Sequence, residues 1–301
     1  MGAEASTDHR GRGVAFALLS ALGFSTLGIF AKLIFAEGFS VPAALAWRFT
    51  IAGLVLWFVV IVTKKPMPRP ILPVLLLAFL GFAPQAGLYF MTVSILDPGI
   101  ASLLLYVYPS FVVLISLVLF RKRPGWIRSA ALLLSLCGCL VTFWKAGSYP
   151  PIGVGLGLTV ALSYAAYLVI GERVYANVDP LVSTAMVMGA AAIVYWIIAA
   201  VTGGARLPVT LPAVGAFLGM ALFASVLPIT MLFASLRLIG ASDTSLVSTM
   251  EPVLTVIWSA LLLGERFGQA QVLGGILIII SVLMIDLAPR MMGLVRSSRR
   301  A

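Results

Sequence analysis

The stretch YVYPSFVVLISLVLFRKR, residues 106–123, recurs in outline 143 residues later as TMEPVLTVIWSALLLGER, residues 249–266. In each stretch a proline, Pro109 or Pro252, precedes a long run of apolar and small residues that ends in a charged cluster. A repeat of this length predicts that the chain contains one helical bundle twice.

The composition places this bundle in a membrane. Of the 301 residues, 61% are hydrophobic and 10% are charged, against about 45–50% apolar and about 25% charged in a soluble domain. No soluble core of this size buries so much apolar surface. The polar first dozen residues resemble the start of a signal peptide, but the apolar run behind them is long enough to span, which predicts an uncleaved first helix.

Ten apolar runs are each near the length of about 20 residues that crosses the hydrocarbon layer. They lie at 14–35, 42–62, 71–96, 99–120, 127–144, 152–171, 181–201, 211–236, 241–263 and 271–287. We therefore expect an all-α integral membrane protein. Its expected parts are a cytoplasmic tail at 1–13, a first five-helix repeat at 14–144, an external linker at 145–151, a second five-helix repeat at 152–287 and a basic cytoplasmic tail at 288–301.

The two repeats are expected to be inverted relative to each other, because five spans are an odd number. Pro84 and Pro228, 144 residues apart, form a second matched pair one apolar run upstream of the first. Inverted repeats around a central cavity are typical of secondary transporters.

Basic residues in the links indicate the orientation. Segments on the side of the N-terminus carry 15 of the 20 lysines and arginines, whereas the opposite links carry three, Lys145, Arg206 and Arg266. The positive-inside rule then places both termini in the cytoplasm. Because topology accounts for the net charge of +10, no nucleic-acid partner is expected.

Three motifs carry a resemblance to a known family: Ala46-Trp47-Arg48-Phe49, Glu251-Pro252-Val253, and Leu263-Gly264-Glu265-Arg266 followed by Gln271 and Gly274. With them the chain resembles the EamA-type drug/metabolite transporters over residues 14–287. The first repeat departs from the family pattern, because Arg121-Lys122-Arg123 stands where members usually show a second glycine–glutamate pair.

The resemblance implies export or uptake of a small organic solute through a central cavity, and the symmetry-related pair of gates favours alternating access. We expect the inner or plasma membrane as its location and no cofactor. The favoured reading is export of an amino acid or related metabolite. Uptake or exchange of nucleoside-like metabolites or drugs is the alternative, and a solute channel is the rival from another class, which saturable transport would distinguish.

Intramembrane prolines leave backbone carbonyls without their usual donors. Pro84, Pro109, Pro228 and Pro252 do so for the carbonyls of Leu80, Leu105, Ala224 and Ser248. In hydrocarbon such a carbonyl needs another donor or a wet cavity. Each proline either forms an ordinary helix kink or lines a cavity. The matched positions of the two pairs favour a cavity, and we expect Tyr108, Ser225 and Glu251 to approach the same cavity.

Glu251 is the one acid predicted near the middle of the membrane. A charged carboxylate there costs at least about 2.5–3.5 kcal/mol, so it must be neutral, paired or hydrated. It is a proton or cation site, a contact to a substrate amine, or a hydrogen-bonded group that fixes the kink at Pro252. From the sequence we favour the last, structural role.

Lys32, Arg48 and Glu172 are candidates for gate or charge roles. Lys32 and Glu172 either snorkel to the nearer interface or contact solute at opposite ends of the cavity. Arg48 lies about 10 Å inside its helix and is expected to serve structure or to balance charge, against Glu251 or a helix end.

Aromatic and polar residues at or near mid-depth complete the candidate cavity: Phe24, Gln85, Tyr89, Tyr106, Tyr108, Tyr164 and Trp258. They either pack the bundle or form aromatic walls suited to an amphipathic metabolite. The small residues Gly138, Gly274 and Gly275 serve either a homodimer face or contacts inside the bundle, and both readings stay open.

The residues give no support to an enzyme. The only histidine, His9, lies in the polar tail, so no metal site is expected. Cys137 and Cys139 point about 200° apart on a helix and cannot form a disulfide with each other. No carboxylate pair or buried base indicates catalysis. No Walker-type glycine loop indicates ATP hydrolysis.

Overall fold

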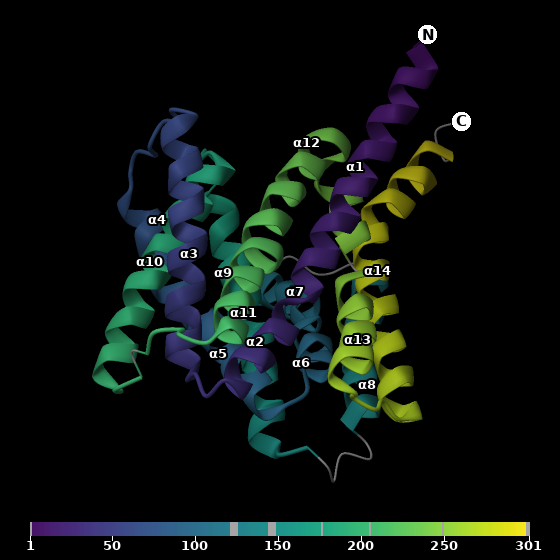
Figure 1. Cartoon of the computed structure of the whole chain (residues 1–301). Coiled ribbons are helices and arrows are strands. Elements are labelled where there is room, and N and C mark those ends of the chain that lie inside the picture. Colours follow the sequence, from purple (N-terminus) through teal and green to yellow (C-terminus); the bar gives the residue numbers. More distant parts are fainter. Residues whose placement is uncertain are drawn as a thin grey trace.

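The computed structural model describes residues 2–120, 126–143, 149–175, 177–204, 206–248 and 250–298. These residues form helices and no strands, as expected (Figure 1). In chain order the elements are α1 (Gly2–Ser25), α2 (Leu27–Ala36), α3 (Val41–Val62), α4 (Leu72–Leu77), η1 (Ala78–Phe82), α5 (Ala83–Ile95), α6 (Pro98–Leu105), α7 (Tyr108–Phe120), α8 (Trp126–Phe143), α9 (Pro151–Val174), α10 (Pro180–Val201), α11 (Leu211–Ala221), η2 (Leu222–Val226), α12 (Leu227–Ser248), α13 (Met250–Leu263) and α14 (Gln269–Ser298).

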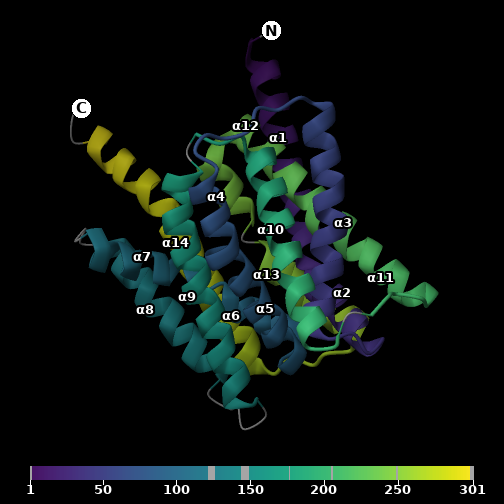
Figure 2. The same ribbon diagram turned by 90° about the vertical axis from the view of Figure 1, so that its left-hand side faces the viewer.

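Six helical stretches of the described chain are long and apolar enough to cross a membrane: Gly11–Ala36, Val41–Val62, Leu72–Ile95, Pro151–Gly171, Pro180–Val201 and Leu211–Ser235. Shorter apolar helices lie at Pro98–Val112, Ser129–Thr142, Met250–Leu263 and Gln269–Met284. Each predicted run overlaps one of these stretches. The chain is therefore a multi-pass membrane protein, and its two termini lie at the same end of the bundle (Figures 1 and 2).

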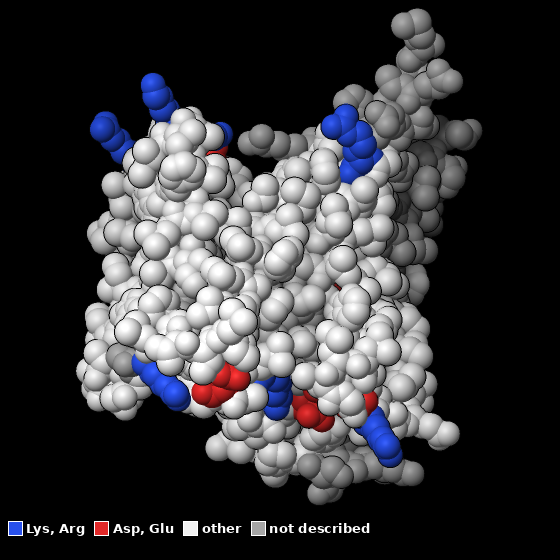
Figure 3. Space-filling view, viewed as in Figure 1, with Lys and Arg blue, Asp and Glu red and all other residues white. Residues whose placement is uncertain are grey.

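Charged residues gather at the two ends of the molecule. Figure 3 shows lysines, arginines and acids at the top and bottom of the visible face, with a broad band of uncharged residues between them. Large apolar side chains on the outside of the helices, such as Leu54, Leu80 and Leu261, are more than two-thirds exposed. Such a surface suits hydrocarbon rather than water.

A π-helical turn precedes each proline of the pair Pro84 and Pro228. In η1 the Ala83 N–H donates to the carbonyl of Ala78, and in η2 the Leu227 N–H donates to that of Leu222, both five residues back. A π turn inserts one extra residue and disturbs the regular ladder, and such turns are frequent at functional sites. In both halves one residue separates the π turn from the proline. The two helices are therefore irregular at matching positions of the repeat.

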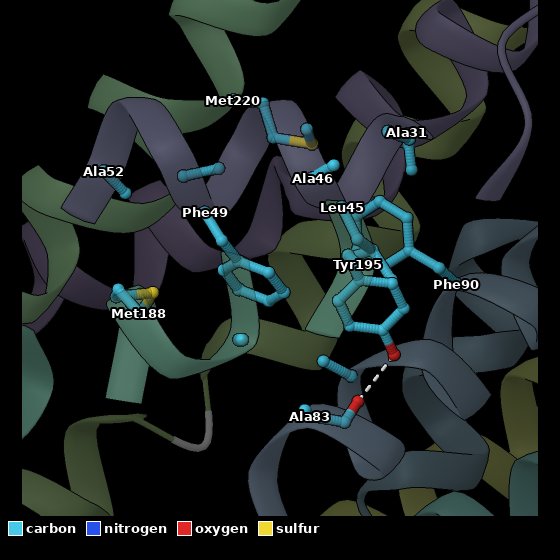
Figure 4. Close-up of a cluster of buried hydrophobic side chains, with 14 of the residues drawn as sticks. Ala31, Leu45, Ala46, Phe49, Ala52, Ala83, Phe90, Met188, Tyr195 and Met220 are labelled. Atoms are coloured by element: carbon cyan, nitrogen blue, oxygen red, sulfur yellow. Dashed lines mark hydrogen bonds between the residues drawn. The ribbon is translucent and has the colours of Figure 1, made fainter. Parts of the chain in front are cut away.

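Hydroxyl groups from other helices clamp both irregular turns. Tyr195 on α10 donates to the carbonyl of Ala83 at 2.6 Å, and Ser20 on α1 donates to that of Pro228 at 2.8 Å. Figure 4 shows the Tyr195 contact inside the main core, beside Phe49 and Phe90. These contacts hold the irregular turns in fixed positions.

Helices of the two halves pack against each other in a regular pattern. α3 packs on α10, α8 on α14, α1 on α12, and α9 on α5. If the ten predicted spans are numbered along the chain, the second packs on the seventh, the fifth on the tenth, the first on the eighth and the third on the sixth. Each span has a counterpart five places away in the other half. Replacing every span by its counterpart gives the same four pairs.

Glycines allow α8 and α14 to approach closely. A Cβ atom on Gly138 would lie 2.8 Å from the carbonyl oxygen of Gly274, and one on Gly275 would lie 3.2 Å from the side chain of Leu103. These small residues therefore make contacts inside the bundle.

The chain reverses direction within the range of α12. The hydroxyls of Ser235 and Thr244 lie 2.9 Å apart, whereas nine residues of straight helix rise about 13.5 Å. The ribbon must fold back between them, which agrees with the predicted boundary between the runs 211–236 and 241–263.

Candidate functional site

Glu251 contacts a tyrosine at the break between α6 and α7. The α6 helix ends at Leu105, α7 begins at Tyr108, and Tyr106 lies in the break. The Tyr106 hydroxyl lies 2.9 Å from Oε2 of Glu251 and 3.1 Å from the carbonyl oxygen of Ser248. The Tyr106 hydroxyl at this break thus contacts the start of α13.

The Ser248 carbonyl is the one that the sequence predicts to lack its donor, since residue 252 is proline. The Tyr106 hydroxyl supplies a replacement donor from another part of the chain. Tyr106 itself is 7% exposed, so these three polar groups meet where little solvent reaches the ring. Polar groups in such a place need each other as partners.

Arg48 on α3 is a buried cation. Its side chain is 5% exposed, its Nε donates to Oγ of Ser225 at 3.0 Å, and its guanidinium lies 5.0 Å from the ring centre of Phe49 and 5.5 Å from that of Phe90. It does not snorkel. Among the described residues no carboxylate lies within ion-pair distance of it, so its terminal nitrogens lack an anionic partner.

The second π turn positions Arg48. Ser225 lies in η2, where it accepts from Arg48 and donates its own proton to the carbonyl of Met220 at 3.0 Å. Tyr89 on α5 lies within electrostatic range of both Arg48 and Glu251. Opposite charges from α3 and α13 thus flank one tyrosine, without an ion pair between them.

A series of tyrosine rings leads away from Glu251. Ring centres are separated by 5.9 Å from Tyr106 to Tyr108, 4.9 Å from Tyr108 to Tyr164, 6.4 Å from Tyr164 to Tyr167 and 6.1 Å from Tyr167 to Tyr175. All but Tyr106 are partly exposed. Three of these rings, Tyr106, Tyr108 and Tyr164, are predicted from the sequence to lie near mid-depth. Tyr167 and Tyr175 are not, although the spacing of Tyr164 and Tyr167 on α9 places them on one helix face.

Other predicted residues lie apart from this contact. Phe24 packs on the main core, Gln85 is buried, and Trp258 is partly buried with an indole nitrogen that finds no partner among the described residues. Of the four prolines, Pro109, Pro228 and Pro252 are buried and Pro84 is exposed. Glu172 belongs to α9, and its side chain lies outside the described residues.

The comparisons with known proteins decide the family. A sequence profile described as the EamA-like transporter family matches residues 11–144 and again residues 151–286. The chain belongs to the EamA-like transporter family. Because the profile matches twice, each half of this EamA-like protein is similar to the same sequence pattern.

Curated relatives carry names of the same kind. The chain is 25% identical over 280 residues to "Uncharacterized transporter YcbK" of Bacillus subtilis, covering 87% of this chain and 88% of the relative. It is 26% identical over 234 residues to "Uncharacterized transporter sll1319" of Synechocystis, covering 74% and 69%. A solved structure titled "Crystal structure of protein" aligns with a TM-score of 0.66 at 20% identity, over 93% of this chain and 98% of that one, which supports the fold alone.

A second group of charges lies at the end of this EamA-like bundle away from the termini. Glu265 follows α13 and is near Asp97 and Lys32. Burial first, and the charge of Asp97 next, raise the pKa of Glu265 to about 7, and the charge of Lys32 opposes this shift. The predicted gate charge Lys32 is partly buried and thus belongs to a cluster with two acids.

At the termini end, Lys65 and Asp179 form an ion pair of 2.7 Å between the links that follow α3 and precede α10. Burial raises the pKa of Asp179, but the hydrogen bonds from Lys65 and from the backbone N–H of Leu181 outweigh it and lower the pKa. The pair is partly exposed, so it adds little to stability. It ties the two halves together at this end.

An apolar groove of about 190 Å³ runs along α13 and α14. Leu103, Val256 and Phe267 are among its lining residues, and Pro252 forms part of one wall. Glu251 and Arg48 do not line it. The groove is therefore separate from the contact between Tyr106 and Glu251 and from Arg48.

Proposed function

We propose that the chain exports a small zwitterionic solute of the amino-acid type by alternating access. The transporter would lie in the cell membrane with both termini in the cytoplasm and ten spans arranged as two inverted five-helix repeats. Membership of a transporter family supports movement of a small solute.

Four observations support the inverted repeats. The family profile matches each half, π turns precede both prolines of a matched pair, and the helix pairs are unchanged when the halves are exchanged. Both termini lie at one end of the bundle (Figure 1). With five spans in each half, the second half begins at the opposite end from the first, as inverted repeats require.

The observation that carries the solute class is a pair of opposite charges that do not pair with each other, Arg48, which is buried, and Glu251, which is partly buried. Arg48 and Glu251 have opposite formal charges and lie on different helices, yet they make no ion pair. Removing an unpaired charge from water is costly. A zwitterion placed between them would bring its carboxylate to Arg48 and its ammonium to Glu251, and would remove both costs at once.

The tyrosine series favours a second candidate solute. The rings of Tyr164 and Tyr167 are stacked at 16°, and flat heterocycles bind well against aromatic faces. A nucleoside-like metabolite would use these rings and leave the opposite charges unused. The two candidates therefore differ in their need for Arg48.

The test is counterflow in proteoliposomes with a panel of amino acids and nucleosides. Arg48→Gln removes the cation but keeps hydrogen-bond donors, so we expect amino-acid counterflow to fall about 10-fold or more, the loss of one charge-assisted bond. Glu37→Gln, in an outer link, is the control and should transport normally. Nucleoside counterflow that persists in Arg48→Gln would support the second candidate. Amino-acid counterflow unaffected by Arg48→Gln would contradict the first.

A further inference from the structure

The apolar groove along α13 and α14 lies open on the outside of the bundle. Leu103 and Pro252 at its floor are buried, whereas Ile257, Val272 and Ile276 at its rim are 44–50% exposed. Both helices lie at one edge of the bundle (Figure 1). In a multi-pass membrane protein such an apolar rim faces hydrocarbon, so the groove opens to lipid rather than to water.

The packing of the two helices accounts for the groove. α13 packs mainly on α1 and α6, and α14 packs mainly on α8. Each helix thus has its main partners elsewhere, which leaves the seam between the two open. Gly275 brings α14 close to Leu103 of α6, because a Cβ atom there would lie 3.2 Å from that side chain. Leu103 therefore closes the seam from behind, and Gly275 has no side chain to fill it.

The groove matches one half of the hydrocarbon layer in length and polarity. Along α14 it extends from Gln271 to Ile279, which is about 12 Å of helix, and one leaflet contributes about 15 Å of hydrocarbon. Gln271 is the one polar residue among the described residues that line the groove. It lies in the first turn of α14, at the end of the bundle away from the termini. The polar end of the groove therefore lies toward the membrane surface at that end.

An exposed cation lies at the polar end of the groove. Arg266 immediately precedes Phe267, which lines the groove. The side chain of Arg266 is exposed, and no acid among the described residues lies within ion-pair distance of it. Its neighbour Glu265 is half-buried near Asp97 and Lys32 instead. A guanidinium binds phosphate through two parallel N–H bonds, so Arg266 is suited to bind a phosphate at the surface of the membrane.

We propose that the groove is a phospholipid site, which takes one acyl chain between α13 and α14 and binds the lipid phosphate through Arg266. The chain suits the apolar lining, and the phosphate complements the charge of the arginine. The zwitterionic solute proposed above does not suit this lining, because its charges would be left without partners there. The lipid site does not rest on the proposed function, since it concerns another ligand and another part of the molecule.

The bound lipid has a structural effect on the second half of the chain. Its acyl chain fills the seam between two helices whose main partners lie elsewhere. Because the lipid binds the folded chain, it raises the free energy of unfolding. Pro252 at the floor of the groove adjoins Glu251, so the lipid also supports the segment of α13 that Tyr106 contacts.

The first test separates the phosphate from the acyl chains. Native mass spectrometry of the purified protein measures binding of dioleoylphosphatidylglycerol and, separately, of dioleoylglycerol, which has the same chains and no phosphate. Arg266→Gln should weaken phospholipid binding about 10-fold or more, the loss of one charge-assisted contact, and should leave dioleoylglycerol binding unchanged. Arg206→Gln, which removes another exposed arginine in a link at the same end, is the control. An equal effect of Arg266→Gln on both lipids, or no effect on either, would overturn the proposal.

The second test fills the groove with a large side chain. Val272→Trp adds an indole ring at the rim, and Leu273→Trp makes the same change at the next residue, which does not line the groove. The two native side chains are 50% and 54% exposed, so the variants are matched. Val272→Trp should lose the binding of both lipids and the rise in unfolding temperature that the phospholipid causes. Leu273→Trp should keep both.

Three results of the second test would contradict the site. If both tryptophan variants bound lipid alike, the lipid would belong to the general layer that coats any membrane protein. A wild-type dimer that Val272→Trp dissociates would assign the groove to a second copy of the chain. Displacement of the phospholipid by an amino acid would assign the groove to the solute.

Discussion

Glu265 shows how a single residue at the end of a span connects pH to stability. Its carboxyl is half-buried beside Asp97, and its Oε2 finds no hydrogen-bond partner among the described residues. Burial raises its pKa from 4.5 to about 7 in the folded chain. A carboxyl with a raised pKa takes up a proton on folding, so the folded state loses stability as the pH rises through this interval.

We therefore expect the stability of the wild type to depend on pH through Glu265. Between the two pKa values of 4.5 and about 7, the thermal unfolding temperature of the wild type should fall relative to that of Glu265→Gln, because the amide imitates the protonated carboxyl. Unfolding of the detergent-solubilised protein across this pH range measures it. Glu37→Gln makes the same change in another link, where the side chain accepts a hydrogen bond from Thr210, and serves as the control. Parallel curves for wild type and Glu265→Gln would contradict the prediction.

At the residue scale the sequence predicted which charges lie inside apolar runs but not what they touch. Arg48 and Glu251 stand out because charges inside apolar runs are rare. The partner of Arg48 is Ser225, not a carboxylate, and the partner of Glu251 is Tyr106. The first contact involves the π turn η2 and the second the break between α6 and α7, and hydropathy resolves neither of these irregularities.

At the scale of elements, the close contact between α8 and α14 sets a limit on side-chain size. A methyl group at Gly138 would lie 2.8 Å from the backbone oxygen of Gly274 and 3.0 Å from atoms of Ile278. Backbone cannot move aside as a flexible side chain can. Gly138→Ala should therefore destabilise the protein by about 1–3 kcal/mol.

Gly155→Ala in α9 is the matched control, because nothing lies within 4 Å of its added methyl group. It should be neutral or stabilise the protein by up to about 1 kcal/mol, since alanine favours helix over glycine. Thermal unfolding and size-exclusion chromatography are measured together. If Gly138→Ala dissociated a homodimer without lowering the unfolding temperature, Gly138 would belong to a dimer face and the prediction would be wrong.

The extent of the helices could be predicted from apolar run length, and their irregularities could not. The predicted runs overlap the observed apolar stretches because hydrocarbon thickness fixes the length of a span. The prolines indicated kinks near residues 84 and 228. The π turns before them, and the clamping hydroxyls of Tyr195 and Ser20, depend on packing between helices far apart in the chain.

For the whole molecule, the proposed topology makes a prediction about the two ends. In a chain whose native Cys137 and Cys139 are replaced, Arg266→Cys should react with a membrane-impermeant maleimide in intact cells. Lys64→Cys, at the end that carries the termini, should react only after permeabilisation, because the positive-inside rule places that end in the cytoplasm. Labelling of both positions in intact cells, or the reverse pattern, would refute the orientation.

Duplication could be predicted from two proline pairs, and the family profile matches each half. How the halves interlock could not, because the partner of each helix lies in the other half. α3 meets α10 through the rings of Trp47 and Trp196, whose centres are 5.2 Å apart, and through the bond from Trp196 to Thr50. Contacts over such distances in sequence leave no local pattern.

The bond between Arg48 and Ser225 has a consequence for how the protein is made. Its partners are 177 residues apart, and ribosomes add about 5–20 residues per second. For roughly nine to thirty-five seconds of synthesis, the nascent first half must therefore hold a guanidinium in or near the membrane before its acceptor has been translated. During that interval water, lipid phosphate or the insertion machinery has to stand in for Ser225, and a ribosome that stalls before η2 leaves an arginine that quality control can recognise.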